Sequence, residues 1–198
     1  ENLEFDVTII REKKSELFPE FNSIVLPSYQ FIPGYRSFRL FVLIPLLCIF
    51  KGADYVFEPA HFGPFNLPSR IKRITLIHDL TPLRYPEFHR SISAYLQGIF
   101  IPGILKKADL ILTVSKSTRN DIIQLIPDVK DKIQVLPLGP SSYLKINPDP
   151  RVLDKYKIHQ PYLLTLGTIE PRKNLALLLD AFKELKSEDK INHQLVIA

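Results

Sequence analysis

Short apolar runs alternate with amphipathic segments along this chain of 198 residues. The apolar runs have strand length, and the amphipathic segments repeat their apolar positions every three or four residues. The pattern predicts strands at 7–10, 24–26, 54–57, 73–77, 110–114, 133–136, 162–166 and 193–198, and helices at 35–50, 92–107, 117–125 and after Asn174. Alternation of this kind is typical of an α/β protein whose parallel sheet is covered on both faces.

A segment without periodicity divides the chain. Residues 137–150, PLGPSSYLKINPDP, are rich in proline, serine and asparagine, so we expect an inter-domain connector there. The predicted domains are 1–139 and 161–198, joined by 140–160. Two such units that face each other form a cleft, and ligands of open parallel sheets bind outside the carboxyl ends of the strands.

The segment YLLTLGTIEPRKNLALLLDAFKELK, residues 162–186, joins a strand to an amphipathic helix through a cationic loop. Gly167 permits a sharp exit from the strand, and Asn174 is a good helix N-cap. Arg172 and Lys173 then lie at a helix N-terminus, where the macrodipole disfavours cations but attracts anions. The loop therefore predicts a phosphate site, with solvated surface cations as the alternative.

Polar residues follow three other predicted strands. His78 and Asp79 come directly after 73–77, His61 follows 54–57, and Ser115 follows 110–114. Imidazole changes protonation near neutrality and bonds hydroxyls or phosphates, so this edge predicts a second site. Each residue also has a purely structural alternative. His78 could bond only nearby backbone, Asp79 could cap a turn or a helix, and His61 could close a turn. Ser115, or else Ser117, could cap helix 117–125.

Composition agrees with a globular α/β protein, because 45% of residues are hydrophobic and 24% are charged. The net charge of +5 is dispersed and accompanies no nucleic-acid motif, which disfavours a nucleic-acid partner and leaves a mild attraction to anionic membranes. Cys48 is the one cysteine, so no internal disulfide forms and a reducing compartment fits best.

Several common sites have no counterpart in the sequence. With seven glycines, the chain has neither a dinucleotide fingerprint nor a phosphate-binding P-loop, and it lacks the nucleophile elbow of hydrolases. His89, His159 and His193 have no partners at metal-ligand spacing, so no metal site is expected. The apolar run 40–50 is too short to span a bilayer; a buried helix or contact with a membrane surface are the two interpretations.

Two motifs carry a family resemblance. One motif is GTIEPRKN, which precedes a leucine-rich helix, and the other is IHDLTPLRYPEFH, which follows a strand. They resemble segments of the second and first domains, respectively, of glycosyltransferase family 4. The resemblance implies a GT-B fold of two Rossmann-like domains facing a cleft, with Arg172, Lys173, Gly167 and Thr168 beside the donor diphosphate. It also implies that His78 is catalytic and faces the donor sugar. Many members carry arginine after the glycine, where this chain has Thr168.

The resemblance implies retaining transfer of a hexose of the mannose, glucose or rhamnose type. The donor is a nucleoside diphosphate sugar, with no cofactor and no obligatory metal, and the acceptor is a polysaccharide or lipid-linked glycan. Asp79, His61 and Ser115 are candidate sugar or acceptor contacts. We expect a cytoplasmic protein that also touches the inner membrane face.

The chain starts and ends in predicted strands and contains no methionine, so we expect a fragment that is inactive alone. The family's glycine-rich loop and paired glutamates are expected to lie outside it. Two alternatives stay open: a GT-B nucleotide-sugar epimerase, and a non-catalytic α/β module that binds a phosphorylated ligand.

Overall fold

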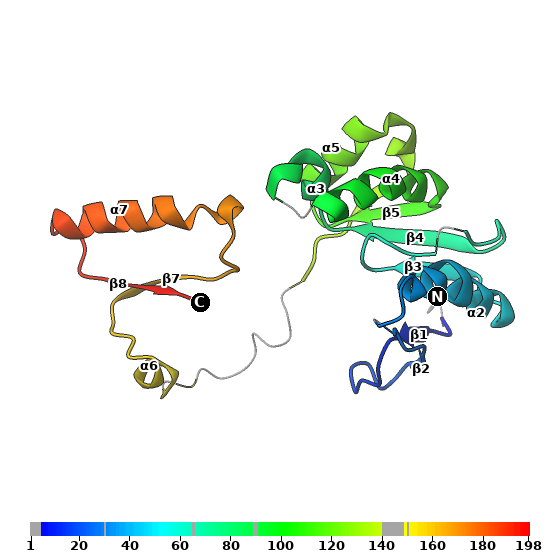
Figure 1. Ribbon diagram of the computed structural model, residues 1–198, viewed down its shortest axis with the longest axis horizontal. Helices are drawn as coiled ribbons and strands as arrows, with labels where there is room; N and C mark the ends of the chain where they lie inside the picture. Colours follow the sequence, from blue (N-terminus) through cyan, green and yellow to red (C-terminus); the bar gives the residue numbers. More distant parts are fainter. Residues whose placement is uncertain (1–4, 30, 65, 89–90, 140–148, 150) are drawn as a thin grey trace. The chain divides into compact units, whose positions relative to one another are not determined.

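The computed structural model describes residues 5–29, 31–64, 66–88, 91–139, 149 and 151–198. It contains two compact units (Figure 1). The first unit joins residues 1–83 to 95–137, and the second joins 84–94 to 138–198. Most of the predicted connector, 140–148 and 150, lies outside the described residues, so the domain boundaries stay a prediction.

The first unit is built on a four-stranded parallel sheet in the order β3-β4-β5-β6. A separate parallel pair, β1 and β2, precedes it in the chain. The strands are β1 (Thr8–Arg11), β2 (Asn22–Val25), β3 (Tyr55–Glu58), β4 (Lys72–Ile77), β5 (Leu110–Thr113) and β6 (Ile133–Val135). All six predicted strands of this unit are confirmed, with ends that differ by no more than a residue or two.

The core of this unit lies on one face of the sheet, against α4 (Ser91–Lys107) and α5 (Lys116–Leu125). The strand order follows the chain, and right-handed crossovers then place both connecting helices on the same side. The register puts three isoleucines on that face: Ile77, Ile111 and Ile133. They belong to one buried cluster with apolar residues of the two helices, which include Ile101, Leu105 and Ile122.

The opposite face is covered only in part. Leu76 of β4 is buried there, but Tyr55 and Phe57 of β3 are 61% and 52% exposed. The prediction that both faces are covered is therefore confirmed for the helical face and wrong at β3 in the part of the chain that the structure describes. The reason is the sequential strand order, because it sends α4 and α5 to the same side.

The predicted helix 35–50 forms as three consecutive pieces. They are α1 (Tyr35–Phe38), the π-helix η1 (Arg39–Leu43) and α2 (Ile44–Phe50). Pro45 has no backbone N–H and its ring crowds the carbonyl four residues earlier, that of Phe41, which explains the wider π turn before it. The Asn66 side-chain amide donates to this Phe41 carbonyl. Cys48 on α2 is buried, and burial raises the pKa of its thiol.

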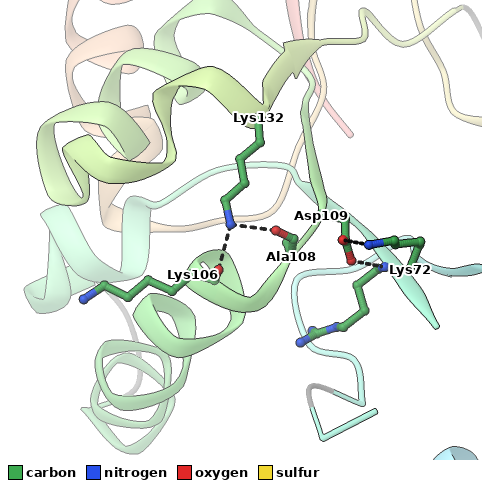
Figure 2. Close-up of polar contacts among 6 residues, drawn as sticks. Lys72, Lys106, Ala108, Asp109 and Lys132 are labelled. Atoms are coloured by element: carbon green, nitrogen blue, oxygen red, sulfur yellow. Dashed lines mark hydrogen bonds and ion pairs between the residues drawn. The ribbon is translucent and has the colours of Figure 1, made fainter. Parts of the chain in front are cut away.

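Polar contacts fasten the amino-terminal ends of the strands (Figure 2). The Lys132 ammonium donates to the carbonyls of Lys106 and Ala108 at 2.7 and 2.6 Å, which caps the end of α4, and burial lowers its pKa. The Asp109 carboxylate accepts from the Arg73 backbone N–H and from Lys72 Nζ, each at 2.9 Å. These two bonds, the backbone one first, lower the pKa of Asp109.

The second unit is a single βαβ motif. The parallel strands β7 (Tyr162–Thr165) and β8 (Gln194–Ile197) are connected by α7 (Leu175–Ser187), as predicted. The short helix α6 (Arg151–Lys155) lies within 140–160, the predicted inter-domain connector, and was not predicted. Four further short elements were not predicted: α3 (Thr81–Arg84) and the 3-10 turns η2 (Pro86–Phe88), η3 (Pro127–Lys132) and η5 (Pro171–Lys173). Elements this short carry no hydrophobic period.

The α/β class with parallel sheets is confirmed, and both units are consistent with the Rossmann-like domains of a GT-B protein. The cleft between the units stays a prediction. Among the described residues, no helix has the length and apolarity needed to cross a membrane.

Candidate functional site

Four predicted site residues meet at one edge of the first unit's sheet. His61, His78 with Asp79, and Ser115 follow β3, β4 and β5, which are neighbours in the sheet. Because parallel strands share the same carboxyl edge, their following residues gather there. The rings of His61 and His78 have centroids 5.5 Å apart, and Ser115 connects to His78 through Thr118.

Two hydrogen bonds hold the ring and the backbone N–H of His78. Its ring Nε2 lies 2.9 Å from the Pro59 carbonyl, and its backbone N–H donates to His61 Nε2 at 2.8 Å. A carbonyl only accepts, so Nε2 of His78 carries a proton, and the neutral ring presents Nδ1 as an acceptor. No residue in the described part of the chain bonds this Nδ1. The predicted alternative, a backbone-bonded His78, is thus observed, and its catalytic role stays a prediction.

His61 bridges the ends of β3 and β4. Its backbone N–H donates to the Leu76 carbonyl at 3.2 Å, and its ring Nε2 accepts from the backbone N–H of His78, which follows β4. The backbone of His61 is left-handed, with φ of 56°, which costs a non-glycine residue about 1–2 kcal/mol. The pKa of His61 is lowered, mainly because burial disfavours the charged ring. The Asp79 carboxylate raises this pKa by a smaller amount, and the His78 ring lowers it slightly.

Asp79 and Ser115 both act as caps. Asp79 Oδ1 accepts from the backbone N–H and the hydroxyl of Thr81, at 2.9 and 2.6 Å, at the start of α3. Ser115 Oγ accepts from the Thr118 N–H at 3.1 Å and so caps α5, which confirms Ser115 over Ser117. The Thr118 hydroxyl in turn donates to the His78 carbonyl at 3.1 Å. Thr118 was not predicted as part of this site, although a residue three positions after an N-cap serine commonly bonds that serine.

A buried ion pair underlies this edge, and the sequence analysis missed it as well. Glu58 Oε1 accepts from Arg73 Nη2 at 2.8 Å and Nε at 3.2 Å, while Oε2 accepts from the Thr75 hydroxyl at 2.8 Å. The two charged side chains are 2% and 4% exposed. A Cβ on Gly63 would lie 2.0 Å from Glu58 Cδ, so only glycine lets the loop after β3 pass this close. Charged residues within apolar strands were the available signal.

The cationic loop of the second unit is organised by a residue that was not predicted as part of the site. Glu170 Oε1 accepts from the Thr168 hydroxyl at 2.6 Å, and Oε2 accepts from Arg172 Nε at 2.5 Å. These bonds, Thr168 first, lower the pKa of Glu170. Both partners of the ion pair are more than a third exposed.

The cations of this loop lie before the helix. Arg172 and Lys173 form the 3-10 turn η5, and Asn174 separates them from α7. Asn174 occupies the predicted N-cap position of α7, but its backbone is left-handed, with φ of 48°, and its side chain makes no capping bond. The left-handed backbone turns the chain at this point, which an extended N-cap residue does not do. Lys173 Cε would lie 4.0 Å from a Cβ on Gly167, so these two predicted site residues are neighbours.

The two clusters offer different chemistry. The carboxyl edge of the first unit presents a fixed imidazole acceptor, and the loop of the second unit presents exposed cations and hydroxyls suited to an anion. Among the described residues, no three histidine, cysteine, aspartate or glutamate side chains are grouped as metal ligands.

Comparison with known proteins decides the family. The model of the family described as Glycosyltransferase Family 4 matches residues 1–140. The chain belongs to this family. It is 36% identical over 151 residues to the O-antigen chain mannosyltransferase B of Escherichia coli, covering 73% of this chain and 39% of that protein. The chain therefore spans well under half the length of this relative.

Two further similarities are more distant. The serotype-specific mannosyltransferase WbdA of Escherichia coli is 28% identical over 145 residues, which cover 64% of this chain and 16% of that protein. A crystal structure of a glycosyltransferase from Rickettsia africae covers 96% of this chain and 59% of its own chain, at 16% identity and a TM-score of 0.45. At that score the structural likeness carries no argument.

Proposed function

We propose that this chain is part of a retaining glycosyltransferase that moves a hexose from a nucleoside diphosphate sugar to a glycan or lipid-linked acceptor. Mannose is the first candidate, because the similar proteins are named mannosyltransferases. The observation that carries the proposal is His78, held at the carboxyl edge of the sheet with Nδ1 as its remaining acceptor.

In this proposal His78 orients the donor sugar. A neutral ring whose Nε2–H is committed to Pro59 accepts a hydrogen bond at Nδ1 and cannot donate one there. A sugar hydroxyl donates to such an acceptor, whereas a leaving phosphate needs a donor. We therefore assign His78 to a hydroxyl of the transferred hexose rather than to the diphosphate.

The cationic loop is proposed to receive the diphosphate. Charge develops on this leaving group as the bond to the sugar breaks, and fixed cations lower the barrier by stabilising that charge. Arg172 and Thr168 now bond Glu170, so a bound diphosphate replaces the Glu170 carboxylate as their acceptor. Lys173, whose charge also acts on Glu170, adds a second cation beside Gly167.

We propose, in addition, a cytoplasmic protein that touches the membrane holding its acceptor. The helical segment 35–50 exposes four apolar side chains at intervals of four residues, namely Phe38, Val42, Leu46 and Phe50. Exposed cations, Arg36 and Lys51, flank them. Flotation with anionic phospholipid vesicles tests this: Phe50→Ser with Leu46→Ser is expected to reduce binding, and unchanged binding contradicts the contact.

Donor turnover tests the enzymatic proposal. The complete protein that carries this sequence is incubated with nucleoside diphosphate mannose, glucose and rhamnose, with and without glycan acceptors. Acceptor-dependent release of nucleoside diphosphate, with an unchanged anomeric configuration in the product, is expected. Release or sugar interconversion without acceptor favours an epimerase, and absence of turnover and of nucleotide binding favours a non-catalytic module. The 198-residue chain alone is expected to be inactive, and sugar transfer by it would refute that expectation.

A further inference from the structure

We propose that His61 is the positioning residue of His78, and that it holds His78 only while its own ring is neutral. This inference rests on the proposed function, because it concerns the residue assigned to the donor sugar. It starts from a contact that neither motif resemblance nor composition indicated: the ring of one histidine accepts the backbone N–H of the other.

The loop after β3 grips His78 at two points. The His61 ring accepts from the His78 backbone N–H at 2.8 Å, and the Pro59 carbonyl, two residues earlier in the same loop, accepts from His78 Nε2 at 2.9 Å. The first bond fixes the backbone and the second fixes the ring and its tautomer. A third bond, from the His61 N–H to the Leu76 carbonyl at 3.2 Å, joins the same loop to β4.

The loop itself has little freedom to move. Glu58, the last residue of β3, is bonded to Arg73 and Thr75 of β4, and Gly63 packs against the Glu58 side chain with no room for a Cβ. His61 lies between these two fixed positions and adopts a left-handed backbone at φ of 56°. Strained backbone that is over-determined by its surroundings is frequent at functional sites.

The bond between the histidines depends on protonation. Nε2 of His61 accepts a hydrogen bond, so its neutral ring carries the proton on Nδ1. Protonation would place a second N–H on Nε2, facing the N–H of His78, and two donors repel. The charged and titratable groups facing His61 are the Asp79 carboxylate and the His78 ring, whereas the nearby charge of Glu58 is matched by Arg73.

Two substitutions separate positioning from simple packing. In His61→Gln the amide oxygen reaches the place of Nε2 and accepts without titrating. In His61→Leu a side chain of similar size accepts nothing. His159→Gln, at an exposed histidine of the second unit, is the matched control. The methyl signals of Ile111 and Ile133 report whether the core of the first unit stays folded.

The first readout is imidazole nitrogen NMR of the 198-residue chain between pH 4.5 and 8. We expect His78 to carry its proton on Nε2 and its backbone amide signal to move with the same midpoint as the His61 ring. His61→Gln keeps the tautomer and removes that movement, while His61→Leu gives mixed tautomers. The proposal is overturned if folded His61→Leu keeps the His78 tautomer, or if the His78 amide signal does not follow the titration of the His61 ring. If His61→Leu does not fold, the wild type and His61→Gln decide.

The second readout is turnover by the complete protein. Misplacing a reacting group costs about 10- to 100-fold in rate, so His61→Leu is expected to lower kcat by at least that smaller factor. His61→Gln is expected to retain kcat within about threefold and to lose the acid limb of the pH profile. Equal kcat in His61→Leu and wild type contradicts the inference. Absence of turnover in the wild type refutes the proposed function, and the NMR readout still decides the role of His61.

Discussion

The two clusters of candidate site residues differ in what holds them. At the edge of the first unit, His78 donates to the Pro59 carbonyl and to the His61 ring, and its own carbonyl accepts from the Thr118 hydroxyl. In the loop of the second unit, Thr168 and Arg172 bond only a neighbouring side chain, Glu170, at an exposed position. The cluster of the first unit is therefore fixed by hydrogen bonds within the fold, whereas the bonds of the cationic loop are exposed and can exchange with an anion, as the proposed donor site requires.

Electrostatics explains the difference. An exposed ion pair such as Arg172 with Glu170 is screened by water and contributes little to stability, so a ligand displaces it easily. The Glu58–Arg73 pair below the histidine edge is nearly inaccessible to water, and breaking such a pair leaves an uncompensated buried charge. Four predictions test this contrast.

Removing the buried cation is expected to have the largest effect. Arg73→Met leaves Glu58 charged and buried, so the free energy of unfolding should fall by about 3–5 kcal/mol. Urea unfolding followed by circular dichroism measures it. Arg172→Met is the matched control and should cost less than about 1 kcal/mol. The double variant Glu58→Leu with Arg73→Met should recover most of the loss; equal costs at Arg73 and Arg172 would remove the contrast between the units.

Removing the cation of the exposed loop is expected to affect binding rather than folding. Lys173→Ala should weaken pyrophosphate binding about tenfold, because one charge-assisted bond to phosphate is lost. Titration calorimetry on the 198-residue chain measures it. Lys183→Ala, an exposed lysine of α7, is the control and should change little. Equal losses at the two lysines would point to net charge alone.

The pH dependence of folding is expected to show the histidine contact. The pKa of His61 is lowered in the folded protein, so the unfolded chain binds more protons as the pH falls below about 6.5. The neutral, partly buried ring contributes its full stability above that pH, and this contribution is lost progressively as the pH falls towards the folded pKa. Stability curves of wild type and His61→Gln should diverge only below that pH; parallel curves would contradict the neutral ring that the contact requires.

The smallest effect is expected at Glu170. Glu170→Gln removes a negative charge beside the predicted diphosphate, and the affinity for pyrophosphate should rise about threefold at low salt. The gain should shrink at high ionic strength, because exposed charges are screened. Glu188→Gln, beyond the carboxyl end of α7, is the control. Weaker binding by Glu170→Gln would show that Glu170 orients Arg172 for the ligand rather than competing for it.

Most of the fold was predictable because its signals are local. Apolar runs of strand length located β3 to β8, and the carboxyl-end rule for parallel strands indicated that His61, His78 and Ser115 share an edge. The prediction failed where no local period exists. The short helix α6, the π turn before Pro45 and the left-handed backbone of Asn174 are too short to carry a hydrophobic period.

The sequence by itself determined the α/β class, the family and the residues that reach the strand ends, since periodicity and motif spacing are properties of contiguous residues. Only the tertiary structure decided which atoms those residues present. The tautomer of His78 depends on the Pro59 carbonyl, which belongs to the loop after β3, and the burial of Glu58 depends on Arg73 of the neighbouring strand. These bonds join residues that are far apart in the sequence, and only folding brings such residues within hydrogen-bonding distance.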